Sequence, residues 1–168
     1  HKVFEKRWAW IIVLLLISIV PFWYYHWFNI NEHHSGDIVL YYLPRVDHVK
    51  QSVLEYHSWF PLWTPYYFAG TSYIGKPNDP YMNPFLGPLI FLLPTTLGAI
   101  KISMVLGMLI AGIGMFLLVD YLLQNKYAAL LAALIYMFND FILVRIFYWG
   151  WIVFAYEYPL LPFILLFT

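Results

Sequence analysis

The stretch KISMVLGMLIAGIGMFLLVDYLL, residues 101–123, decides the fold of this chain. It is long and apolar enough to cross a hydrocarbon core of about 30 Å, which takes about 20 apolar residues in a helix. Gly107, Ala111 and Gly114 recur at a spacing that allows a second helix to approach closely. We therefore expect a transmembrane helix that packs against neighbouring helices.

The composition of the whole chain agrees with this expectation. Hydrophobic residues make up 62% of the sequence and charged residues 11%, against about 25% charged residues in soluble domains. The net charge is zero, which argues against a nucleic-acid partner. Cysteine is absent, so a disulfide framework and a thiolate nucleophile are excluded. The expected fold class is an all-α membrane protein, a polytopic transmembrane helix bundle.

Three more spans are predicted from the apolar runs, at residues 8–25, 127–143 and 151–168. Lys2, Lys6 and Arg7 precede the first span, so the N-terminus is expected in the cytoplasm of a multi-pass protein of the cell membrane.

The two ends of the sequence suggest that the chain is a piece of a longer protein. It begins at His1 and stops at Thr168 inside an apolar run. We expect residues 1–168 to form one transmembrane domain. Further transmembrane helices of the same or another chain would be its partners, together with membrane lipids.

A long extracytoplasmic loop, residues 26–98, separates the first two spans, and long loops are usually functional. Residues 43–57 predict an amphipathic surface helix with Pro44 in its first turn. Its apolar stripe is expected to contain Leu43, Val46, Val49, Val53 and Leu54, with Arg45, Asp47, His48, Lys50 and Gln51 largely facing away. The helix either lies flat on the membrane or packs on the core of the loop. Residues 85–94 are too short to span and predict a re-entrant or interfacial segment.

Asp37 is the strongest candidate for a catalytic residue. It follows Gly36 in the outer loop, soon after the first span. A carboxylate at the outer membrane edge can act as general base toward an acceptor hydroxyl. The alternative is an ordinary N-cap or turn aspartate.

The cluster Glu32, His33, His34 and Asp37 contains ligand types suited to a divalent metal. Adjacent histidines point in different directions, however, and no HExxH-like spacing is present. We therefore expect no metal site and no other cofactor.

Cationic and aromatic side chains are the remaining candidates. Arg45, Lys50 and Lys76 could bind a phosphate or lie among lipid headgroups. Arg145 stands in an apolar stretch, where an ionisable group is costly unless it is paired or functional. Several aromatics could stack on a sugar or an isoprenoid, or serve as interfacial anchors: Tyr41, Trp59, Trp63, Tyr66, Tyr67 and Tyr73.

The order of motifs along the chain carries a resemblance to a known family. GDIVLYYLP (residues 36–44) is followed by the surface helix and by FPLWTPYYFAG (residues 60–70). Then come GKPNDPYMNP (residues 75–84) and the span that contains AALLAALIYMF (residues 128–138). This order resembles the N-terminal part of the bacterial YfhO-like membrane proteins, which belong with the GT-C glycosyltransferase superfamily.

The resemblance implies a GT-C-like enzyme that transfers a sugar from a polyprenyl-phosphate donor without a metal. The acceptor would be a lipid, cell-wall polymer or protein of the envelope, on the outer face. Asp37 would be the base, with Asp47 and Asp79 as possible assisting acids. Arg45, Lys50, Lys76 and Arg145 would meet the donor phosphate or lipid headgroups, and Tyr41, Trp59, Trp63 and Tyr67 would stack on sugar or lipid.

The sequence departs from part of the superfamily pattern, because it has neither a paired-acid motif nor a DxD motif. A different interpretation therefore stays open, in which the chain is a non-enzymatic membrane subunit or scaffold that binds lipid or partner helices within a larger complex.

Overall fold

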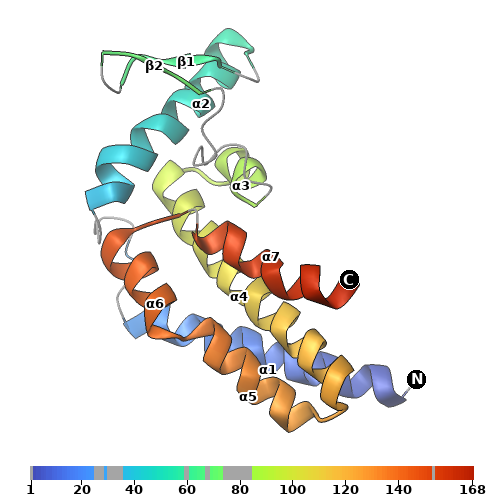
Figure 1. Ribbon diagram of the computed structural model, residues 1–168. Coiled ribbons are helices and arrows are strands. Elements are labelled where there is room, and N and C mark those ends of the chain that lie inside the picture. Colours follow the sequence, from blue (N-terminus) through green and yellow to red (C-terminus); the bar gives the residue numbers. More distant parts are fainter. Residues whose placement is uncertain are drawn as a thin grey trace.

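The computed structural model describes residues 2–24, 29, 36–58, 61–66, 69–73, 85–152 and 154–168. The described chain is helical apart from one short strand pair, which confirms the all-α class (Figure 1). The α-helices are α1 (Lys2–Tyr24), α2 (Leu43–Tyr56), α3 (Leu86–Leu92), α4 (Thr96–Leu123), α5 (Lys126–Met137), α6 (Asp140–Leu143) and α7 (Phe154–Phe167). The π-helices are η1 (Ile38–Tyr42) and η3 (Val144–Trp149), and the antiparallel strands are β1 (Trp63–Thr64) and β2 (Thr71–Ser72).

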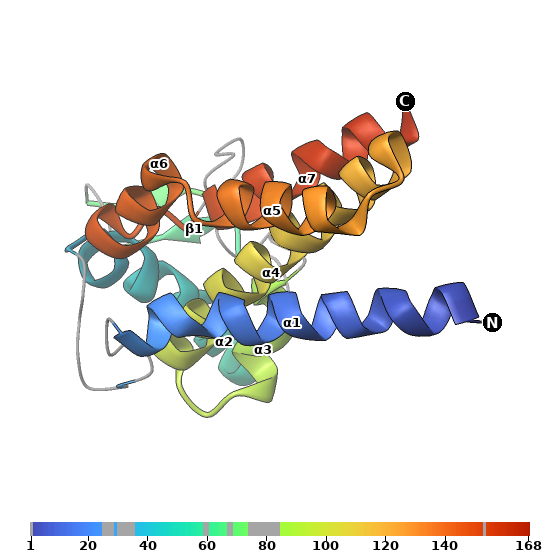
Figure 2. The same ribbon diagram turned by 90° about the horizontal axis from the view of Figure 1, so that it is seen from below.

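Helix α4 is the central element, and α1, α3, α5 and α7 all contact it. Two views show the N-terminus, the turn between α4 and α5, and the end of α7 at one end of the bundle, with α2 near the other end (Figures 1 and 2). The small residues of α4 are used within the chain, because Gly112 lies against Met137 of α5 and Gly114 against Phe163 of α7. The predicted close helix approach is confirmed.

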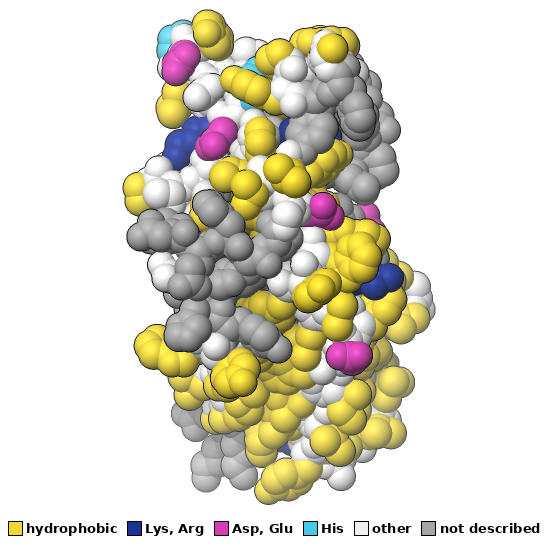
Figure 3. All heavy atoms as spheres, turned by 90° about the vertical axis from the view of Figure 1, so that its left-hand side faces the viewer, with side chains coloured by type: hydrophobic (Ala, Val, Ile, Leu, Met, Phe, Trp, Pro, Cys, Tyr) yellow, Lys and Arg dark blue, Asp and Glu magenta, His cyan; other side chains and the backbone are white. Residues whose placement is uncertain are grey.

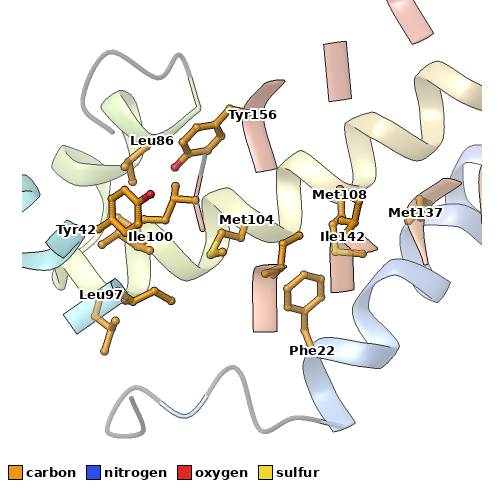
Figure 4. Packing of buried hydrophobic residues seen from close by; sticks show 14 of the residues in the cluster. Phe22, Tyr42, Leu86, Leu97, Ile100, Met104, Met108, Met137, Ile142 and Tyr156 are labelled. Carbon is orange, nitrogen blue, oxygen red and sulfur yellow. The ribbon is translucent and has the colours of Figure 1, made fainter. Parts of the chain in front are cut away.

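The core runs along one side of α4. Leu97, Ile100, Met104 and Met108 form a row of buried side chains on this helix (Figure 4). Neighbouring elements contribute Phe22 of α1, Tyr42 of η1, Leu86 of α3 and Met137 of α5. One apolar cluster therefore joins the bundle to the segment around η1.

Two helical stretches are long and apolar enough to cross a membrane, Thr96–Leu123 and Lys126–Trp149. Large apolar side chains are exposed along the bundle, among them Leu16, Val20, Leu131, Ile135 and Leu165. Figure 3 shows hydrophobic side chains over the lower part of one face, with most of its charged groups higher up. Soluble monomers rarely expose apolar surface on this scale, so these features indicate association with a membrane. The four-span topology and its orientation remain predictions.

Several helix boundaries differ from those expected, because capping side chains set them. Helix α4 begins five residues earlier than predicted, where the Thr95 side chain accepts a hydrogen bond from Gly98 N. The predicted third span is interrupted between α5 and α6. There, the Asn139 side chain accepts from Ile142 N and begins a new helix. Asn, like Thr, is a preferred N-cap residue because its side-chain oxygen satisfies a free amide of the first turn.

The predicted surface helix is present as α2, but two of its side chains face the opposite way from the prediction. Val46, Val49 and Val53 are buried as expected, and α2 contacts α3 and α4, so this stripe is covered by protein. Leu54 is 60% exposed and Arg45 only 1% exposed, so both of these predictions are wrong. The reason is a second covering layer, because Tyr73, just after β2, packs over Arg45.

The stretch before α2 was expected to be a loop, and this prediction is also wrong. Gly36 and Asp37 are helical, and Asp37 has φ −68° and ψ −34°. The helix continues without interruption through η1 into α2. Asp37 therefore lies at the start of a helix that leads into the core.

Candidate functional site

The carboxylate of Asp37 is held by a side chain from a distant part of the sequence. Trp151 Nε1 donates a hydrogen bond of 2.8 Å to Asp37 Oδ2, across 114 residues of chain. Asp37 occupies the N-cap position of η1 but makes no side-chain capping hydrogen bond. The Asp37 side chain therefore does not cap η1.

Arg145 lies over the same indole. Its Cζ is 5.2 Å from the centroid of the Trp151 ring and 3.7 Å from that of Phe141. A guanidinium within about 6 Å of an aromatic face is attracted by the negative potential of that face. Asp37, the predicted base, and Arg145, one of the predicted phosphate ligands, thus both contact the indole of Trp151.

A glycine turn places Trp151 in this position. Helix η3 ends at Gly150, which has φ +68°, and Gly150 N and Trp151 N both donate to Arg145 O. A left-handed residue at a helix end is usually glycine because other side chains clash there. The chain therefore folds back at Gly150 and brings the Trp151 ring over Arg145.

The Asp37 side of the contact is anchored in the core. Tyr42, five residues further along, is buried, and its hydroxyl group points toward that of Tyr156 (Figure 4). Tyr156 is buried as well, and its hydroxyl oxygen lies 3.2 Å from Ser103 Oγ of α4. The helix that contains Asp37 thus meets the segment after η3 at two places. One is the hydrogen bond between Trp151 and Asp37, and the other is the packing of Tyr42 and Tyr156 in the core.

The other predicted cations lie elsewhere on α2. Arg45 donates a hydrogen bond to the Tyr41 hydroxyl group and lies over the rings of Tyr41 and Tyr73. Lys50 Nζ donates to the carbonyl oxygens of Leu93 and Pro94, at 3.1 and 3.3 Å. Both side chains join α2 to its neighbours, and their predicted contact with a phosphate remains a prediction.

A second polar cluster surrounds Tyr73. Its hydroxyl group donates to Arg45 O at 3.1 Å and lies 3.1 Å from His48 Nδ1. The His48 ring stacks on Tyr73 and meets the Tyr66 ring edge-on. Burial lowers the pKa of His48 below its ordinary value of 6.5. The neutral imidazole therefore belongs to the packing between α2 and the strand pair.

The remaining candidates are separate from Asp37 or lie outside the described residues. Asp47 is half-buried on α2, ten residues further on, which corresponds to about 15 Å along a helix. Trp63 on β1 is exposed and lies against Gly70. The candidates outside the described residues are Glu32, His33, His34, Trp59, Tyr67, Lys76 and Asp79.

The assembled groups can accept a proton, attract an anion and offer an aromatic face. Trp149 is 51% exposed, and its ring meets that of Trp151 at a centroid distance of 5.7 Å. Among the residues that the structure describes, no three His, Asp or Glu side chains come together as a metal site. Asp37 is an acid–base group whose indole partner also contacts a cation.

Trp149, Gly150 and Trp151 are not among the predicted site residues. The signal was the sequence WGW shortly after Arg145 in an apolar stretch, where a glycine between aromatics suggests a turn. Comparison with protein-family models, with curated proteins and with solved structures gave no match.

Proposed function

We propose that this chain is part of a polytopic, GT-C-like membrane glycosyltransferase that transfers a sugar from a polyprenyl-phosphate donor to an acceptor on the outer face. One observation carries the proposal. The Asp37 carboxylate accepts a hydrogen bond from Trp151, whose ring also contacts Arg145, instead of capping its own helix. A carboxylate fixed in this way matches the acidic residue that the YfhO-like resemblance implies near the end of the first span.

In the proposed reaction Asp37 takes the proton of the acceptor hydroxyl group. The acceptor oxygen forms a bond to the anomeric carbon while the bond from that carbon to the phosphate oxygen breaks. The electron pair leaves with the polyprenyl phosphate, and the configuration at the anomeric carbon is inverted. A correctly positioned general base contributes about 10² to 10⁴ in rate.

The leaving phosphate gains negative charge in this reaction and needs a nearby cation when no metal takes part. Arg145 lies over the ring of Trp151, the hydrogen-bond partner of Asp37, and its planar guanidinium group suits phosphate oxygens. The exposed ring of Trp149 offers a face on which a sugar can stack. The described residues thus supply a base, a cation and an aromatic surface.

The decisive experiment is the Asp37→Asn variant, assayed in membranes with a labelled polyprenyl-phosphate sugar. We expect transfer to fall at least about 100-fold, because the amide cannot accept the proton. Glu55→Gln is the matched control, since it removes an acidic group of α2 at an exposed position to which no catalytic role is assigned. Full transfer by Asp37→Asn would refute the role of Asp37 as base, and absence of transfer by the wild-type protein would favour the scaffold interpretation.

A further inference from the structure

We infer that Trp151 is a positioning residue for Asp37, and that Arg145 acts on the carboxylate through the indole ring. The inference rests on the proposed function, because it concerns how the proposed base is held. It assigns a role to the WGW turn.

The hydrogen bond engages one carboxylate oxygen and leaves the other for a substrate. Trp151 Nε1 lies 2.8 Å from Asp37 Oδ2. Among the described residues Trp151 is the one hydrogen-bond partner of the Asp37 side chain, and Oδ1 accepts no hydrogen bond from them. When one oxygen of a carboxylate is held, the lone pairs of the second oxygen keep a defined direction.

Arg145 strengthens this hydrogen bond. Its guanidinium carbon is within 6 Å of the Trp151 ring centroid, where a cation draws electron density toward the ring face. The loss of electron density makes the indole N–H a better hydrogen-bond donor. Neighbouring groups in a chain of hydrogen bonds polarise one another in a similar way. A donor to a charged oxygen forms a shorter and stronger hydrogen bond than a neutral pair does.

Both partners are fixed independently of substrate. Trp151 is fixed by the turn at Gly150, whose backbone bonds return to Arg145 O. Asp37 is fixed by the helix that enters the core at Tyr42. The carboxylate is therefore held by rigid elements, which is the arrangement that a functional group needs for precise alignment.

The first test needs no enzymatic activity. The chain is labelled with ¹⁵N-tryptophan in lipid nanodiscs, and the Trp151 indole N–H resonance is assigned as the signal that Trp151→Phe removes. We expect this resonance to lie downfield in the wild type, as that of a hydrogen-bonded N–H does, and to move upfield in Asp37→Ala, which removes the acceptor. A resonance at the same position in both proteins would overturn the inference.

The second test separates positioning from folding. Trp151→Phe keeps the ring but removes the N–H, so we expect kcat to fall about tenfold while the KM for the donor stays unchanged. Trp23→Phe, at an exposed tryptophan of α1, is expected to keep the wild-type kcat. Wild-type kcat in Trp151→Phe, with Asp37→Asn inactive, would overturn the inference and leave the proposed function standing. Full transfer by Asp37→Asn would refute the proposed function instead, while the resonance still decides the hydrogen bond.

Discussion

Replacing Gly114 with alanine is expected to destabilise the packing of α4 on α7. A Cβ atom at this position would lie 2.6 Å from Cε2, 2.9 Å from Cδ2 and 3.2 Å from Cζ of Phe163. Carbon atoms in contact prefer separations of about 3.5 to 4.0 Å, so the ring must move. Overpacking of this kind costs about 1 to 3 kcal/mol, while alanine gains about 1 kcal/mol over glycine in a helix. We expect a net loss of about 1 kcal/mol in the free energy of unfolding.

A double-mutant cycle separates these two contributions. In a Phe163→Ala background the ring is gone, so Gly114→Ala should stabilise the protein by about 1 kcal/mol through helix propensity alone. The two backgrounds should thus differ by about 2 kcal/mol. Gly36→Ala is a control, because a Cβ there meets no atom within 4 Å and should not destabilise the protein.

The assay is reversible unfolding in mixed micelles with increasing denaturing detergent, followed by tryptophan fluorescence. Equal effects of Gly114→Ala in the presence and absence of Phe163 would refute the reasoning. A Gly114→Ala protein that is more stable than the wild type would also refute the reasoning. The contact of the added Cβ atom with Phe163 would then not destabilise the protein.

Two further predictions concern the packing of α2. Because burial lowers the pKa of His48, the unfolded chain binds a proton below pH 6.5 that the folded chain does not. Stability should therefore be complete above pH 6.5 and fall as the pH drops through 6.5 toward the lowered value. Unfolding at pH 7.5 and 5.5 should show this loss, and His48→Gln should reduce it; an unchanged pH dependence in that variant would contradict the assignment. Lys50→Met should cost about 1 kcal/mol in the same unfolding assay, because it removes the donor to the carbonyl groups after α3, whereas Lys50→Arg should retain most of the stability. Equal stability of Lys50→Met and wild type would show that these hydrogen bonds contribute nothing.

The sequence was sufficient to predict the features that depend on local pattern. The central helix and the close approach of another helix at Gly114 follow from apolar content and residue size, and the structure has both. The orientation of Arg45 did not follow, because the predicted stripe assumed one covering surface. Tyr73, from the strand pair, provides a second one, and a helical periodicity cannot reveal contacts made by a distant segment.

The candidate site was predictable only in part, for the same reason. Asp37 and Arg145 stand out individually because ionisable groups are rare in this composition. Their common partner Trp151 depends on a tertiary contact across 114 residues. The WGW sequence suggests a turn, but nothing in the sequence shows which of the eight tryptophans meets Asp37.

The geometry of η1 explains why this contact could not be inferred from helical periodicity. In an α-helix, with 3.6 residues per turn, residues five apart point about 140° away from each other. Asp37 and Tyr42 would then face different neighbours, and only one of them could meet the segment after η3. A π-turn closes its hydrogen bond at the fifth residue, as Leu43 N does on Ile38 O, and brings residues five apart onto nearly the same side. The wide turn therefore allows Tyr42 to pack in the core while Asp37 reaches Trp151. A substitution that restored a regular α-helix here would leave the core residue in place and rotate the carboxylate away from its partner.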